Sequence, residues 1–156
     1  MDTTPRSAHP RDESGVPRPL GYWVKHIHDG LEGNLAAAVG DLGLDRRLWQ
    51  ILDTVAHGPI DVSATAEALA PFVGQGRDAI GPRLAALVEC GAIIADASGR
   101  HTLTDLGAEL HAEAADRVHA ARLATMRGFS DEEFGTLLDL LRRVASNVDD
   151  VAAQWK

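Results

Sequence analysis

The sequence is poor in aromatic side chains and in cysteine, and both shortages restrict what the chain can be. Aromatic residues make up 4% of the 156 residues, whereas hydrophobic residues make up 45%. The core must therefore consist mainly of leucine, alanine, valine and isoleucine, and abundant alanine favours helix over sheet. Cys90 is the only cysteine, which excludes an internal disulfide and a cysteine-based zinc site. A chain of this length is expected to form about one domain.

Long apolar runs and positive charge are scarce as well. No stretch approaches the ~18–20 apolar residues of a membrane span, and the N-terminus lacks the apolar core of a signal peptide. We therefore expect no membrane partner and a cytoplasmic location. The chain has 15 Lys and Arg against 23 Asp and Glu, a net charge of −8, whereas nucleic-acid binders usually carry a basic face.

Signatures of catalysis and metal binding are lacking too. The sequence has no nucleophile elbow, no phosphate loop and no carboxylate–histidine pair whose spacing defines a geometry, so we expect neither an enzyme nor a cofactor. His26 and His28 point to different sides of a helix. His111 and His119 would lie about 12 Å apart along one, and no metal site is predicted. Cys90 is interpreted either as an inert cysteine or as a redox switch.

The chain begins with a polar segment and then becomes helical. Residues 1–18 hold three prolines and almost nothing apolar, which predicts a disordered tail. From Leu20 onward a helix is predicted, and Gly43 is expected to end it. Its apolar residues recur at four-residue spacing: Trp23, Ile27, Leu31 and Leu35.

Capping residues predict where the following helices begin. Asp45 is expected to cap a helix that ends near Gly58-Pro59, and Ser63 to cap a short helix before Pro71. Further along, Thr104 is expected to open a long helix. A capping box is predicted at Ser130 and Glu133, which begins the last helix.

Between these helices the sequence predicts a reading unit. A helix is expected over 77–90, although Gly81-Pro82 leaves open a start at Gly81, because proline is tolerated only in the first turn. Two short strands, 92–95 and 100–103, are joined by a turn that indicates a hairpin. A short helix, a turn, a second helix and a two-stranded ribbon form a winged helix-turn-helix. The alternative is a plain helical bundle with one hairpin.

Several segments resemble the MarR family of bacterial transcription regulators. They are Gly43-Leu44 with Trp49 and Leu52, "LAALVECGAI" at 84–93, "LTDLGAEL" at 103–110 and "SDEEFGTLLDLLRRVASNV" at 130–148. Their order and spacing together are fairly specific, and the resemblance extends over roughly residues 20–150. It implies a mainly α fold, a winged helix-turn-helix with long N- and C-terminal dimerisation helices and a short two-stranded β wing.

The resemblance also implies a domain organisation and partners. Residues 1–18 would be the tail, 19–44 the N-terminal dimerisation helix, 45–104 the DNA-binding domain and 105–156 the C-terminal dimerisation helices. The partners would be a second copy of the chain and double-stranded DNA, bound as a palindrome. The expected DNA-binding residues are Arg77, Asp78, Gly81, Arg83, Arg100 and His101.

A small aromatic or anionic effector is expected between the dimerisation helices and the winged domain. Trp23 and His26 are neighbours on one helical face, and an indole beside an imidazole suits a flat aromatic ligand. The alternative for both tryptophans is a place in the core. The expected ligand-binding residues are Tyr22, Trp23, His26, Trp49 and His57.

Two features depart from the family pattern. The wing is several residues shorter than usual and lacks the Asp-x-Arg element at its tip. The segment from Ile60 to Asp105 contains six acidic residues and only three arginines. Because phosphate contacts supply most non-specific affinity for DNA, this segment is expected to bind DNA weakly. Two alternatives to a ligand-responsive repressor therefore stay open. One is a scaffold that has lost DNA binding and binds or transforms a small molecule, and the other is a winged domain that docks on a protein.

Overall fold

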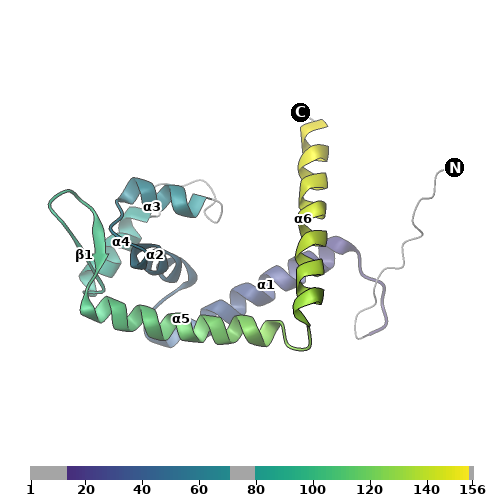
Figure 1. The fold of residues 1–156 in the computed structure, drawn as a ribbon, viewed down its shortest axis with the longest axis horizontal. Helices are drawn as coiled ribbons and strands as arrows, with labels where there is room; N and C mark the ends of the chain where they lie inside the picture. The colour runs from purple at the N-terminus through teal and green to yellow at the C-terminus, as the bar shows by residue number, and fades with distance from the viewer. Residues whose placement is uncertain (1–13, 71–79, 155–156) are drawn as a thin grey trace. The chain divides into compact units, whose positions relative to one another are not determined.

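The computed structural model describes residues 14–70 and 80–154. It divides into two units, Met1–Val118 and His119–Lys156, and each is considered by itself. The described elements are helical except for one hairpin, in the order expected for a winged helix-turn-helix (Figure 1). The first unit holds α1 (Leu20–Val39), η1 (Gly40–Leu42), α2 (Arg46–Ala56), α3 (Val62–Leu69), α4 (Ile80–Glu89), β1 (Ile93–Ala95), β2 (His101–Leu103) and most of α5 (Asp105–Thr125). The second holds the end of α5 and α6 (Asp131–Gln154).

Four of the predicted helix boundaries are confirmed, one by its backbone conformation and three by capping hydrogen bonds. Gly43 adopts φ 74° after η1 and so ends the first helical segment. The Asp45 carboxylate accepts from Leu48 N at 2.7 Å. Gly107 N donates to the Thr104 hydroxyl at the start of α5, and Ser130 and Glu133 form the reciprocal capping box before α6.

The predicted cap of α3 is wrong. Asp61, not Ser63, precedes the helix, and its carboxylate accepts from Ala64 N at 2.8 Å. Both residue types cap helices well. Asp61 takes the position because its carbonyl also accepts from Thr65 N and from the Thr65 hydroxyl, which starts the first turn two residues earlier.

Of the two starts predicted for the reading helix, residue 77 and Gly81, the second is wrong. Ile80 is already helical, so α4 does not begin at Gly81, and Pro82 is the third residue of the helix as described. Residues 77–79 of the predicted helix lie outside the described residues.

The hairpin is confirmed, with one addition. Its strands pair antiparallel in the register Ile93–Leu103, Ile94–Thr102 and Ala95–His101. His101 also exchanges two backbone hydrogen bonds with Ile60, in the segment before α3. This third short pairing ties the wing to the helix-turn-helix.

The core of the first unit lies among α2, α3, α4 and the hairpin, which Figure 1 shows gathered together. Each helix contributes its apolar stripe, and the largest fully buried hydrophobic side chains all belong to this unit. They are Ile51, Leu52, Ile80, Leu84, Leu87, Ile93, Val39 and Val55.

The start of α5 packs directly against the turn that links α4 to β1. A Cβ on Gly107 would lie 1.8 Å from the Ala92 carbonyl oxygen, which is backbone and cannot rotate away. Thr104 N donates to the same oxygen at 3.0 Å, and its hydroxyl donates to Gly91 O at 2.6 Å. Only glycine permits this approach.

We predict that Gly107→Ala lowers the free energy of unfolding by about 1–3 kcal/mol or more, as overpacking does. Urea unfolding measured by circular dichroism tests this. Gly33→Ala is the matched control, because its Cβ would meet nothing within 4 Å, and alanine in a helix is favoured over glycine by about 0.5–1 kcal/mol. Equal stability of the two variants would contradict the close packing.

Candidate nucleic-acid interface and ligand pocket

Helix α4 carries one described cation, and that cation is already paired. Ile80, Leu84 and Leu87 bury the inner side of the helix. At the edge of this buried side Arg83 Nη1 donates to Asp45 Oδ2 at 2.6 Å, and both side chains remain partly exposed. Gly81 is half-buried. The predicted Arg77 and Asp78 lie outside the described residues.

Asp45 therefore serves two elements at once. It caps α2 through Leu48 N and holds Arg83 of α4. Partial burial raises its pKa, but the hydrogen bonds from Arg83 and Leu48 outweigh this and hold the pKa below its usual value. The carboxylate is thus charged at neutral pH and competes with any phosphate for Arg83.

The wing tip repeats this arrangement. The Asp96 carboxylate accepts from the Ser98 hydroxyl at 2.6 Å and from the Ser98 and Arg100 backbone amides. Arg100 Nε lies 3.4 Å from Asp96 Oδ2. His101, also predicted to contact DNA, is 8% exposed and lies beneath the wing rather than on its surface. Its Nδ1 has no hydrogen-bond partner.

Three of the five predicted ligand-binding residues lie together on α1. The Tyr22 and His26 rings are stacked with centroids 5.9 Å apart, and Trp23 meets both rings edge-on. Arg18 lies 4.8 Å above the Tyr22 ring. The Trp23 Nε1 atom is buried without a hydrogen-bond partner.

The other two residues lie on or next to α2, in different surroundings. Trp49 is 5% exposed and stacks on His111 of α5 at 5.4 Å. His111 Nε2 lies 2.9 Å from Asp53 Oδ1. His57 is exposed, and its Nδ1 lies 2.6 Å from the Asp53 carbonyl oxygen. No sequence pattern connects His111 with Trp49, because the two residues are 62 positions apart.

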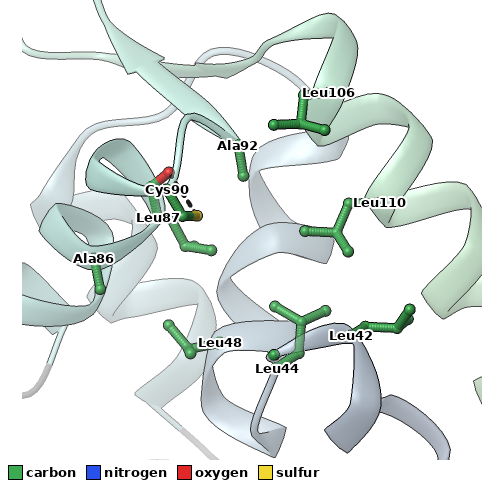
Figure 2. A pocket seen from close by; sticks show the side chains of 10 residues that line it. Leu42, Leu44, Leu48, Ala86, Leu87, Cys90, Ala92, Leu106 and Leu110 are labelled. Carbon is green, nitrogen blue, oxygen red and sulfur yellow. Dashed lines mark hydrogen bonds between the residues drawn. The ribbon is translucent and has the colours of Figure 1, made fainter.

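A separate pocket of about 370 Å³ lies between the start of α2, the end of α4 and the start of α5. Figure 2 shows Leu106 and Leu110 of α5 facing Leu87 of α4 and Cys90, which follows α4, across it. None of the five predicted ligand-binding residues lines it. The lining residues are Leu42, Gly43, Leu44, Leu48, Ala86, Leu87, Cys90, Ala92, Leu106 and Leu110.

Over residues 14–70 and 80–154 no helix is long and apolar enough to cross a membrane. In the same part of the chain no group of three or more His, Cys, Asp or Glu side chains is placed to hold a metal ion.

Comparison with known proteins identifies the fold. No family model and no curated protein matches the sequence. Among solved structures, Rv2887 of Mycobacterium tuberculosis, a MarR family protein in complex with DNA, is 22% identical with a TM-score of 0.65, over 81% of this chain and 98% of Rv2887. The reduced form of MarR from E. coli is 18% identical with a TM-score of 0.67, over 85% and 98%. The chain has the MarR fold.

A third neighbour agrees with this assignment. A MarR family regulator from a Rhodococcus species is 20% identical with a TM-score of 0.66, over 81% of this chain and 93% of the other. At these identities the likeness establishes the fold, and the predicted MarR architecture with its short wing is confirmed. Rv2887 has also been crystallised with salicylic acid and with p-aminosalicylic acid.

We predict that Asp96 titrates with a pKa of about 2, against an ordinary value of 3.8, chiefly because the Ser98 hydroxyl bonds its charged form. A depressed carboxyl pKa means that the hairpin turn is fully stabilised above 3.8 and loses this support as the pH falls through about 2. NMR titration of the side-chain carboxyl tests it. Ser98→Ala should raise the pKa, whereas Ser63→Ala should leave it unchanged, and an ordinary wild-type value would contradict the turn geometry.

Proposed function

We propose that this chain is a MarR-type transcription regulator, a DNA-binding homodimer that responds to a small molecule, and not an enzyme. The observation that carries the proposal is the winged helix-turn-helix within the MarR fold. Its α4 would enter the major groove and its hairpin would lie along the neighbouring backbone. The DNA complex of Rv2887, which shares this fold, supports the proposal.

The DNA contacts we propose follow from the reading unit. Arg77, Asp78, Gly81 and Arg83 would face the groove, and Arg100 with His101 would serve the wing. A symmetric dimer would read a palindrome whose half-sites are about one helical turn apart, and repression would follow from occupying the operator.

The effector would be a small aromatic or anionic molecule. The cluster of Tyr22, Trp23 and His26, with Arg18 above it, offers stacking surfaces beside a positive charge. Trp49 and His57 remain proposed contacts. The complexes of Rv2887 with salicylic acid and p-aminosalicylic acid support this ligand class for the fold.

The test is binding to a fluorescent duplex taken from DNA flanking the gene, titrated at low and physiological salt. A regulator should bind with nanomolar affinity, resist competitor DNA and weaken steeply with salt. Arg77→Ala and Arg83→Ala should weaken binding.

Asp45→Asn gives a sharper prediction. Asparagine still caps a helix but no longer neutralises Arg83. Duplex affinity at low salt should therefore rise roughly three-fold, comparable to the change per phosphate contact over a four-fold change in salt. Asp41→Asn is the matched control, because it removes the same charge from a carboxylate that pairs with Arg117. An equal rise in both variants would indicate net charge alone and would remove Arg83 from the interface.

The proposed dimer is supported by α6, which exposes an apolar stripe. Phe134, Leu138, Leu141 and Val148 recur at helical spacing and are each at least 40% exposed. We predict that Leu141→Asp converts the dimer to a monomer in analytical ultracentrifugation. Ser146→Asp places the same charge on the other side of the helix and should leave a dimer. A dimeric Leu141→Asp variant would place the interface elsewhere.

A second candidate function has its own observation. Both described arginines of the reading unit, Arg83 and Arg100, are paired with aspartates of this chain. This favours a scaffold that has lost DNA binding and holds or transforms a small molecule. Failure of the wild type and of Asp45→Asn to bind any duplex at low salt would decide for it.

A further inference from the structure

The pocket of about 370 Å³ is lined by segments from six parts of the first unit. η1, the turn at Gly43-Leu44 and the first turn of α2 form one wall, and the last turn of α4 forms the second. Ala92 and the first two turns of α5 close the third. Its volume lies within the roughly 300–1,000 Å³ of small-molecule sites, and several converging elements fit a compact ligand better than an extended chain.

The chemistry of the walls selects the ligand. Of the described residues that line the pocket, six are leucines and none carries a charged side chain; the Cys90 thiol is the one polar side-chain group. That thiol already donates to Leu87 O at 3.3 Å. A carboxylate placed here would lose its hydration without gaining a partner. An uncharged apolar molecule would lose nothing and would cover exposed leucine surface.

The position of the pocket connects it to the reading helix. Ala86 and Leu87 of α4 and Cys90, directly after it, form one wall. This wall begins one turn beyond Arg83, which is bonded to Asp45. Asp45 lies between Leu44 and Leu48, which both line the opposite wall. A ligand that separated these walls would therefore act directly on the Arg83–Asp45 pair.

We propose that this pocket is a second effector site, which binds a compact, uncharged, apolar molecule and shifts α4 against α2. Its role as an effector site rests on the proposed regulatory function, whereas binding itself does not. It differs from the aromatic cluster of α1 in its residues and in the charge of the ligand it accepts.

The single thiol of the chain makes a direct test possible. The reaction of Cys90 with a thiol-specific disulfide reagent is followed in the full chain, with toluene or benzoate added as monosubstituted benzene probes of similar size and different charge. Toluene should slow the reaction, roughly tenfold when its concentration is about nine times its Kd, and benzoate should not. Equal rates with and without toluene overturn the proposal, and so does equal protection by benzoate.

Two alanine variants localise the effect. Ala86 and Ala85 are neighbouring exposed residues of α4, but only Ala86 lines the pocket. Ala86→Leu should abolish protection by toluene, whereas Ala85→Leu should retain it, with circular dichroism confirming both folds. Retained protection in Ala86→Leu overturns the assignment to this pocket.

Duplex binding in the presence of toluene separates the two proposals. A changed duplex affinity in the wild type, absent from Ala86→Leu, supports the effector role. An unchanged affinity with toluene bound overturns that role. Toluene protection in a chain that binds no duplex rejects the regulator but keeps the binding site.

Discussion

The first unit of this protein depends on the junction where α5 meets the turn between α4 and β1. Thr104 bonds both carbonyls of that turn and also caps α5. Gly107 lets the helix backbone approach Ala92 more closely than any side chain would permit. One threonine and one glycine thus connect the end of the reading helix, the hairpin and α5 at one junction, through the backbone contact at Ala92 and the hydrogen bonds of Thr104.

The charge pattern of the reading unit follows a second constraint. Arg83 and Arg100 are each held by an aspartate that is itself needed for local structure, Asp45 as a helix cap and Asp96 as the centre of a turn. Removing either charge for the benefit of DNA would weaken the fold unless an amide replaced it. In the proposed complex a phosphate would therefore have to displace an intramolecular partner of either arginine, which would lower affinity.

The parts of this structure that sequence could predict are local. Helix starts were predictable at Asp45, at Thr104 and at the Ser130–Glu133 box, because capping involves residues only three positions apart. The Ser63 prediction is wrong because two residues that cap helices well lie two positions apart. The hydrogen bonds that decide between them come from Thr65 in the following turn. The pairing of Arg83 with Asp45 joins residues 38 positions apart. The stacking of Trp49 on His111 and the leucine pocket likewise arise only when helices pack, so no periodicity could reveal them.

The same distinction explains why the predicted ligand residues are dispersed. Aromatic and imidazole side chains attract attention in a sequence with few of them, but α1 and α2 carry them into different surroundings. Trp49 fills the core beside His111, whereas Tyr22, Trp23 and His26 form a surface cluster. The pocket, in contrast, is lined mainly by leucine and alanine. These residues are so common in this sequence that they do not indicate a binding site. If the chain is the regulator proposed above, a ligand in this pocket would act on DNA binding more directly than one at either aromatic group, because the pocket wall includes the last turn of the reading helix.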